Sequence, residues 1–350
     1  IPETAMPEAR FLLESAQDPD VGNNSLQHYS ISSNDYFHIY TRRRSDGRRY
    51  AELVLDRALD REQQAEVALS VTAVDGGSPP LSGTALIRVV VLDINDNIPV
   101  FTRSLYKARV LENSREDAPV VVVSASDLDS GTNGEIAYSI VPNSEENLQT
   151  FKVNPETGQI QLKKPVDYEE RKTYEIDIQA TDGGGLSTHC KVEVQVEDVN
   201  DNTPEVVITS LTSTLSEAAP PNTVVALFNV RDRDSGDNGR TSCELPGEQP
   251  FSITQLATDA YALVTSEALD REREAAFHEL VLRASDGGEP ARTGTARIRV
   301  AVLDVIDNAP VFSRAEYTVR VPEDVPVGSI VVTVTAVDPD EGLNGHGRYS

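Results

Sequence analysis

The chain is short of cysteine, of basic residues and of long apolar runs, and each shortage excludes a class of protein. Its 350 residues include only two cysteines. Because Cys190 and Cys243 fall in different sequence repeats, a small scaffold held together by disulfides is excluded. No run of about 18 apolar residues is present, so no segment is predicted to span a membrane. No signal peptide is recognisable at the first residues either.

Basic residues are outnumbered by acidic ones, with 31 Lys and Arg against 57 Asp and Glu and a formal net charge of −26. A surface of this sign repels the phosphates of nucleic acids and the headgroups of anionic membranes. The hydrophobic content of 39% is ordinary for a folded protein, so the acidity does not indicate a disordered tail. Carboxylates at this density repel one another unless cations are bound.

One acidic pentapeptide occurs three times and divides the chain. DINDN at 93–97, DVNDN at 198–202 and DVIDN at 304–308 are spaced by about 105 residues, and proline follows each closely. This period is the length of a small domain, so we predict tandem domains. The predicted domains are 1–101, 102–207, 208–313 and an incomplete copy at 314–350. The incomplete copy leads us to expect a segment of a longer protein.

The second repeat contains seven β-rich runs separated by Gly, Asn, Asp and Pro. The last two runs alternate clearly, with one face formed by Tyr174, Ile176, Ile178, Ala180 and by Cys190, Val192, Val194, Val196. We therefore predict an all-β chain of tandem seven-stranded antiparallel immunoglobulin-like sandwiches. Because seven is an odd number, the chain enters each sandwich at one end and leaves at the other, and the repeats are expected to form a rod.

Acidic motifs recur in the same order in every repeat, and strand direction places them at the repeat ends. Three of these motifs lie at the end where the chain leaves the sandwich. They are a glutamate after the first strand, an acidic pair before the sixth strand, and the pentapeptide. The other two motifs lie at the end where the chain enters the sandwich. They are a D-x-D-x-G-x-N loop after the second strand and an aspartate before two glycines. The carboxylates of one repeat are therefore predicted to meet those of the next repeat.

Such a junction requires a cation. Two carboxylates about 4 Å apart repel by roughly 4 kcal/mol at an effective dielectric constant near 20. Oxygen donors alone, six to eight in number, favour Ca²⁺ over Mg²⁺, whereas zinc prefers Cys and His. An EF-hand is excluded, because the twelfth position counted from Asp127 is Tyr138 instead of glutamate. Calcium is the expected cofactor.

On these ordered motifs the whole chain resembles tandem cadherin repeats. The segment DPDVGNNSLQHYSI at 18–31 is similar to the second extracellular repeat of the clustered protocadherins, which are neuronal adhesion glycoproteins. The resemblance implies the second, third and fourth repeats with the start of the fifth, and a gamma-type member is expected. It also implies three Ca²⁺ ions at each complete junction. The expected location is the extracellular part of a plasma-membrane protein, attached to the membrane through a segment outside this sequence.

The resemblance also implies the calcium ligands of each junction. The first set is Glu3, Asp60, Glu62, Asp93, Asn95, Asp96, Asn97, Asp127, Asp129, Asn133 and Asp182. The second set is Glu112, Asp167, Glu169, Asp198, Asn200, Asp201, Asn202, Asp232, Asp234, Asn238 and Asp286. The third set is Glu217, Asp270, Glu272, Asp304, Asp307, Asn308, Asp338, Asp340 and Asn344. A half-site towards a preceding repeat comprises Asp18, Asp20, Asn24 and Asp75. Ile306 replaces the asparagine of the other pentapeptides, so one ion of the third set is expected to be weakly held.

The resemblance implies calcium-dependent homophilic recognition between cells through an antiparallel pair of rods. Second repeats would contact third repeats, and fourth repeats would contact a first repeat outside this sequence. Phe11 and Leu13 alternate inward, so Arg10, Leu12 and Glu14 form a candidate adhesion surface. A passive calcium-stiffened spacer and a heterophilic receptor segment are the alternatives. An enzyme is disfavoured, because the paired carboxylates recur along the chain without a distinct pocket.

Three further features carry expectations. The sequon at Asn23 is the only N-glycosylation signal, and it lies in an expected calcium loop. The run TRRRSDGRR at 41–49 is expected to be an exposed loop, with a partner-facing basic patch as the alternative. Cys190 and Cys243 are both expected to be buried free thiols.

Overall fold

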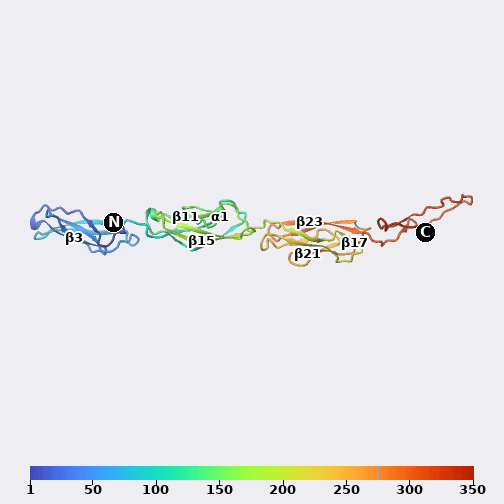
Figure 1. The fold of residues 1–350 in the computed structure, drawn as a ribbon, viewed down its shortest axis with the longest axis horizontal. Coiled ribbons are helices and arrows are strands. Elements are labelled where there is room, and N and C mark those ends of the chain that lie inside the picture. The colour runs from blue at the N-terminus through green and yellow to red at the C-terminus, as the bar shows by residue number, and fades with distance from the viewer. Residues whose placement is uncertain (274–275) are drawn as a thin grey trace. The chain divides into compact units, whose positions relative to one another are not determined.

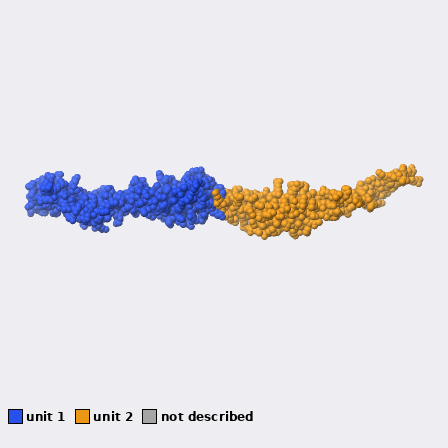
Figure 2. Space-filling view, viewed as in Figure 1, with its two compact units in different colours: residues 1–167, 171–197 blue, residues 168–170, 198–350 orange. Residues whose placement is uncertain are grey.

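The computed structural model describes residues 1–273 and 276–350, and these form a nearly all-β chain (Figure 1). Strands account for 42% of the residues and helix for 4%, which confirms the predicted fold class. Contacts divide the chain into two compact units, 1–167 with 171–197 and 168–170 with 198–350 (Figure 2). No helix in the described part of the chain has the length and apolar character needed to cross a membrane.

The first sandwich of the first unit lies within residues 1–92. Its sheets have the orders β1-β4-β3 and β2-β5-β6, with antiparallel neighbours throughout. Their bounds are β1 Arg10–Leu12, β2 Leu26–Ile31, β3 Phe37–Arg43, β4 Arg49–Leu55, β5 Glu66–Asp75 and β6 Ser82–Val90, and a short 3₁₀ turn covers Gly22–Asn24. Because alternate residues of β5 point inward, Val67 and Leu69 pack with Phe37 and Leu55 in the core.

The second sandwich of the first unit contains the sheet β11-β14-β15-β8 and the sheet β12-β13-β9, with β7 paired to β10. The bounds are β7 Val100–Phe101, β8 Leu105–Leu111, β9 Pro119–Val122, β10 Ala125–Ser126, β11 Ala137–Ile140, β12 Phe151–Val153, β13 Gln159–Leu162, β14 Thr173–Thr181 and β15 Ser187–Glu197. All eight residues predicted to share the inner faces of β14 and β15 are buried, with exposed fractions of 0–4%. The predicted alternation is therefore confirmed.

This sandwich also contains structure that the strand pattern did not predict. A short helix, α1 (Glu145–Thr150), begins after Ser144, whose hydroxyl accepts a hydrogen bond from the amide of Asn147 at 3.4 Å. Glu145 and Glu146 occupy its first turn, where negative charge is favourable. A 3₁₀ turn at Gly131–Gly134 lies in the acidic D-x-D-x-G-x-N loop.

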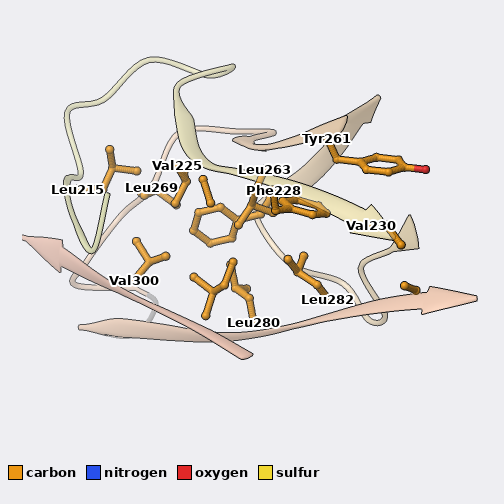
Figure 3. Packing of buried hydrophobic residues seen from close by; sticks show 14 of the residues in the cluster. Leu215, Val225, Phe228, Val230, Tyr261, Leu263, Leu269, Leu280, Leu282 and Val300 are labelled. Atoms are coloured by element: carbon orange, nitrogen blue, oxygen red, sulfur yellow. The ribbon is translucent and has the colours of Figure 1, made fainter. Parts of the chain in front are cut away.

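The second unit contains a third sandwich with the sheet orders β16-β18-β21-β20 and β17-β23-β22-β19. The bounds are β16 Glu205–Leu211, β17 Thr214–Ser216, β18 Val224–Arg231, β19 Ser242–Glu244, β20 Phe251–Gln255, β21 Ala260–Thr265, β22 Phe277–Ser285 and β23 Thr293–Leu303. Figure 3 shows Phe228 and Leu263 from one sheet above Leu280 and Leu282 from the other, and all four are buried. Beyond this sandwich, β24 (Val311–Phe312) pairs with β25 (Ala336–Val337).

In each repeat, the last strand runs parallel to a short segment near the start of the repeat. This holds for β8 with β15, for β17 with β23 and for the isolated bridge between Pro2 and Leu92. Strands paired in parallel run in the same direction. Both strands therefore end on the same side of the sandwich. This arrangement positions the acidic residues that follow each strand.

Candidate metal centres at the repeat ends

A buried glutamate forms the base of each acidic cluster. Glu3 follows the Pro2 bridge, and its backbone N–H donates to the carbonyl of Leu92 at 3.1 Å. Its carboxylate accepts the backbone N–H of Arg61 at 2.9 Å and that of Ile94 at 2.8 Å. One side chain thus links the LDRE turn to the DINDN segment of the same repeat.

The same construction recurs in the other sandwiches. In the second unit, the carboxylate of Glu217 accepts the backbone N–H groups of Arg271 at 2.8 Å and Val305 at 2.6 Å. In the first unit, Glu112 follows β8, is buried, and its backbone N–H donates to the carbonyl of Glu197 at 3.0 Å. The predicted base glutamates therefore occupy equivalent positions.

In the first unit, the DINDN segment of the first repeat meets the D-x-D-x-G-x-N loop of the second. Asp93 accepts hydrogen bonds from the side chain of Asn133 at 2.8 Å and from the amide of Ser130 at 2.9 Å. The side chain of Asn97 donates to Asp129 at 2.6 Å, and its backbone N–H donates to the same carboxylate at 3.2 Å. Residues separated by more than 30 positions are thus held together in one cluster.

Asn95, in the middle of the motif, contacts the two-glycine loop of the second repeat. Its amide nitrogen donates to Asp182 at 3.2 Å. A Cβ atom placed on Gly184 would lie 2.1 Å from Cγ of Asn95, and one on Gly183 would lie 2.0 Å from the carbonyl oxygen of Thr132. The two glycines therefore allow the aspartate loop and the D-x-D-x-G-x-N loop to close around the cluster.

The second unit contains two copies of this hydrogen-bond pattern. Its aspartate–asparagine pairs are Asp198–Asn238 at 2.7 Å, Asn202–Asp234 at 2.6 Å, Asp304–Asn344 at 2.8 Å and Asn308–Asp340 at 2.8 Å. Asn200 occupies the middle position of the first copy, and its side chain donates to the carbonyl of Pro290 at 2.9 Å. In the other copy this position is Ile306, which is 70% exposed.

The remaining predicted ligands lie in the turns around these clusters. Asp60 and Asp270 accept the backbone N–H groups of Gln63 and Arg273 at the LDRE turns, at 3.1 and 2.9 Å. In the D-x-D-x-G-x-N loops, the first aspartate accepts the backbone N–H of the second, as seen for Asp127, Asp232 and Asp338. In the two-glycine loops, Asp182 and Asp286 each accept the backbone N–H of the second glycine. In the pentapeptides, Asp201 and Asp307 each accept a hydrogen bond from the side-chain amide of the following asparagine. Asp167 belongs to the first unit and Glu169 to the second.

Several oxygen atoms of these residues are buried without a hydrogen-bond partner. They are Oδ1 of Asn95 and Oδ2 of Asp127 and Asp182 in the first unit, and Oδ1 of Asn200, Oδ2 of Asp232 and Asp286 and Oε1 of Glu272 in the second. A buried polar atom without a partner costs about 1–3 kcal/mol. Metal coordination would satisfy such an oxygen. These atoms therefore fit a cation site of the kind that the sequence predicts.

The carboxylates also lie close enough to share an ion. In the first unit, Glu3, Glu62 and Asp93 form one group whose ligand atoms lie within 4.8 Å of one another, and Asp96 and Asp129 form a second such group with Glu62. In the second unit, Glu169, Asp198 and Asp234 form an equivalent group. The donors are all oxygens, which matches the ligand chemistry of calcium.

Burial, together with neighbouring negative charges, raises the pKa values of two carboxyls in the first cluster. Desolvation, followed by the charges of Glu3, Asp129 and Asp60, raises the pKa of Asp96. Desolvation also raises the pKa of Glu62, with contributions from Glu3 and Asp96. Without a bound cation, the ionised form of these two carboxyls is therefore disfavoured.

An arginine within the LDRE turn partly neutralises the cluster, and the sequence analysis did not assign it a role. Arg61 bonds to the carboxylates of Asp93 and Glu62 and to the carbonyl of Leu128. Desolvation alone would raise the pKa of Asp93, but hydrogen bonds from Asn133, Ser130 and Arg61 outweigh it and lower this pKa. The sequence signal that could have predicted this role is the presence of a basic residue inside the acidic LDRE motif.

The predicted half-site of the first repeat is more open than the complete clusters. Asp18 accepts the backbone N–H of Asp20 at 2.9 Å, and Asp75 accepts those of Gly77 and Leu81 at 3.0 and 2.8 Å. Asp20 and Asn24 are exposed, whereas the equivalent aspartates Asp129, Asp234 and Asp340 are buried. The loop thus has the local turn geometry without the enclosing partner.

Comparison with known proteins identifies the chain's family. The cadherin-domain sequence profile matches residues 1–92, 106–197 and 211–303. The chain belongs to the cadherin family. Cadherin domains in general bind calcium, and cadherin-family adhesion proteins are not enzymes. The acidic clusters described above are compatible with that property.

These cadherin repeats are similar to clustered protocadherins. The chain is 50% identical over 350 residues to human Protocadherin beta-1, of which it spans 43%. The solved Protocadherin GammaB4 extracellular domain matches with a TM-score of 0.89 and 42% identity, over 99% of this chain and 54% of that one. The solved cadherin domains 1–5 of Protocadherin Gamma B2 match with a TM-score of 0.87 and 41% identity, over 99% and 65%.

The candidate adhesion surface lies on β1 of the first cadherin repeat and, at Glu14, just after it. Leu12 is 63% exposed, and Arg10 and Glu14 are also exposed, while Phe11 and Leu13 pack against the core. Arg10 donates to Glu52 at 3.0 Å. The alternation agrees with the expected orientation of this strand.

Both cysteines are free, but only Cys190 is fully buried. Cys243 is half-buried, a correction to the expectation that both are core residues. It lies on the three-residue strand β19 and packs against the core of the third repeat. Burial raises the pKa of each thiol to about 11, which keeps both in the unreactive protonated form at neutral pH.

Proposed function

We propose that the chain is an extracellular adhesive segment that mediates calcium-dependent homophilic recognition between apposed cells. The observation that carries this proposal is the convergence of carboxylate and amide oxygens, several of them buried without partners, at the ends of cadherin repeats. The similarity to clustered protocadherins supports the homophilic mode, which is the behaviour of that group.

The proposed ligands are the three sets and the half-site named in the sequence analysis. In the first set, Glu3 and Asp93 position the oxygens contributed by one repeat, and Asp127, Asp129 and Asp182 contribute those of the next. A bound calcium ion would supply positive charge to these carboxylates, and the oxygens of Glu3, Asp93, Asp127, Asp129 and Asp182 would hold it. The protein's own contribution is to hold these oxygens in place through the backbone and asparagine hydrogen bonds described above. For the second set, the proposal rests on the repeated sequence motifs.

The adhesive contact itself is proposed to lie outside the calcium sites, because metal ligands common to every repeat cannot distinguish one partner from another. Arg10, Leu12 and Glu14 are candidates on the first repeat. An exposed leucine between charged residues gives an interface both apolar area and charge complementarity. An Arg10→Glu variant that self-associates as strongly as the parent chain would remove this surface from the proposal.

Sedimentation equilibrium in about 1 mM calcium, and again in excess chelator, tests the proposed function. We expect a dimer in calcium and a monomer in chelator. A monomer under both conditions would contradict homophilic recognition by this segment and would favour a calcium-stiffened spacer. A dimer that is equally stable in chelator would contradict the calcium dependence.

A further inference from the structure

The β3–β4 hairpin of the first repeat carries a concentration of positive charge that the adhesive proposal does not use. We call residues 40–50 the basic hairpin. It contains Arg42, Arg43, Arg44, Arg48 and Arg49 and a single acidic residue, Asp46. Its net charge is therefore five minus one, or +4, in a chain whose net charge is −26. A local excess of positive charge in an otherwise acidic chain indicates a specific negatively charged ligand.

The turn at the tip of the basic hairpin is well defined. The backbone N–H of Arg44 donates to the carbonyl of Arg48 at 2.8 Å, and that of Gly47 donates to the carbonyl of Arg44 at 3.0 Å. Asp46 accepts the backbone N–H of Arg48 at 3.0 Å, and Gly47 has the positive φ of +89° that the turn requires. The arginines are thus presented by an ordered hairpin.

The strand register places like charges together. Arg43 lies directly opposite Arg49, and Arg42 lies opposite Tyr50. Like charges at facing positions destabilise a pair of strands. A local arrangement that opposes folding is expected where function requires it. Here a bound anion would relieve the repulsion.

Three of the five guanidinium groups are available to a ligand. Arg42 is paired with Glu52 at 3.2 Å, and Arg49 donates to the carbonyl of Gln27. Arg43, Arg44 and Arg48 are exposed, and among the described residues no carboxylate oxygen lies within 4.0 Å of their guanidinium nitrogens. Arg44 also lies over the ring of Tyr50, 5.4 Å from its centroid, which orients the side chain without neutralising it.

We propose that the basic hairpin binds a sulfated glycosaminoglycan. Its cationic residues are all arginines, whose planar guanidinium forks pair with tetrahedral oxyanions through two hydrogen bonds. Arg43 projects from the face of the hairpin opposite to that of Arg42, because neighbouring residues of a strand point to opposite faces. Arg44 lies over Tyr50, the residue opposite Arg42. Charge therefore surrounds the tip.

A flexible polyanion can wrap such a tip, whereas a folded protein surface contacts one face of it. Clusters of basic residues can bind heparin, and sulfated polysaccharides of this kind are polyanions found outside cells. The inference rests on the extracellular location in the proposed function. It does not rest on homophilic pairing, so the two proposals can fail separately.

The test compares the intact chain with the triple variant Arg43→Gln, Arg44→Gln, Arg48→Gln for binding to a heparin dodecasaccharide in calcium-containing buffer. The matched control is Arg103→Gln, Arg109→Gln, Arg115→Gln, which removes three exposed arginines from the second repeat. Both variants change the net charge by three, from −26 to −29. Differences between them therefore report position and not overall charge.

We expect the intact chain and the control to bind alike, and the hairpin variant to bind at least about tenfold more weakly. The slope of log affinity against log salt should fall by about two to three in the hairpin variant, one for each lost contact. A triple Arg→Lys variant should bind with intermediate affinity. Desulfated heparin should bind weakly to every chain.

Three results would overturn the proposal. The first is that the intact chain and the hairpin variant bind heparin equally well. The second is that the intact chain binds heparin and desulfated heparin equally well. The third is that the control variant loses as much heparin affinity as the hairpin variant. A hairpin variant that retains heparin binding but loses self-association would assign the hairpin to contact with a second copy instead. Circular dichroism checks folding, and we expect the melting temperature to be unchanged or raised, since the variant relieves repulsion between Arg43 and Arg49.

Discussion

Among the predicted ligands of their pentapeptides, the acidic cluster after the first repeat and the one after the third differ only at the middle position. The aspartate–asparagine bonds are equivalent, with Asp93–Asn133 and Asp304–Asn344 both at 2.8 Å. The middle position is Asn95 in the first cluster, where its amide bonds to Asp182 and its oxygen has no partner. In the other cluster, it is the exposed Ile306. The outer aspartates thus hold the loops together, and the middle asparagine contributes a separate oxygen donor.

The arginine of the LDRE turn also differs between the clusters. Arg61 contacts Asp93 and Glu62 within one repeat and the carbonyl of Leu128 in the next. Arg271 reaches Asp304 at 3.4 Å and pairs with Glu341 in the following segment. The counter-charge is therefore closer to the predicted ligands in the first cluster. The first cluster therefore has the additional asparagine oxygen and is also the better compensated without metal, and we predict that it binds calcium more tightly.

Replacing Asn95 with isoleucine should have the largest effect, because it converts the first cluster to the type found at Ile306. The substitution removes one oxygen donor and the hydrogen bond to Asp182, and it places a branched side chain against Gly184. We expect calcium affinity at this cluster to fall by at least about tenfold, as measured by isothermal titration. The matched control is Ile98→Asn, outside the pentapeptide, which should leave calcium affinity unchanged. An Asn95→Ile variant with unchanged affinity would contradict the role of the middle position.

The reverse substitution, Ile306→Asn, should strengthen calcium binding at the later cluster. It supplies the missing oxygen donor and removes an exposed apolar side chain. We expect the weakest calcium-binding step to tighten severalfold, by less than the loss in Asn95→Ile, because the remaining ligands are unchanged. Titration of the variant and the parent chain measures this step. If the weakest step is unaffected, the difference between the clusters has another cause.

In the absence of calcium, replacing the arginine of the LDRE turn should lower the melting temperature by different amounts at the two clusters. Arg61→Gln leaves Asp93 and Glu62 without their nearest positive charge, so we expect the melting temperature in chelator to fall by a few degrees. Arg271→Gln should lower it less, because Asp304 is bonded mainly by Asn344 and the amide of Glu341. In saturating calcium both differences should shrink. Equal effects in chelator and in calcium would show that these arginines act only in packing.

The pH dependence should be the smallest effect, and its sign follows from the raised pKa values. Because the pKa values of Asp96 and Glu62 are raised in the folded, metal-free chain, these groups bind protons more readily than in the unfolded chain. They therefore favour the folded state more as pH falls through the raised values, and less above them. Asp307 in the later cluster shifts in the same direction, through desolvation and the charge of Glu217.

Protons and calcium compete for these carboxylates, so the increase in melting temperature produced by calcium should shrink as pH falls from about 7 towards about 4.5. The lowered pKa of Asp93 acts in the opposite sense, because its contribution to stability is lost only as pH falls through that lowered value. Thermal melts with calcium and with chelator across this range measure the balance. A calcium-induced increase that grows at acidic pH would contradict the assignment of Asp96 and Glu62.

Much of the fold and of the clusters could be predicted from the sequence, because both follow from periodic patterns. Alternation placed Ile176 and Val192 in the core, and strand direction brought Asp93 near Asn133. Helix α1 was missed because six residues do not establish a helical period. The order of the motifs alone did not predict a role for Arg61, and it did not explain why glycine is needed at position 184. Their roles depend on side-chain and backbone approaches between distant segments.

The central claim is that the clustered oxygens are calcium ligands, and equilibrium dialysis of the whole chain against calcium tests it most directly. The account predicts that several ions bind per chain with half-saturation at about 0.1–1 mM. It also predicts that Asn95→Ile weakens one of these binding steps while Ile98→Asn does not. A chain that binds no calcium at about 10 mM, well above the range for extracellular modules, would contradict the account.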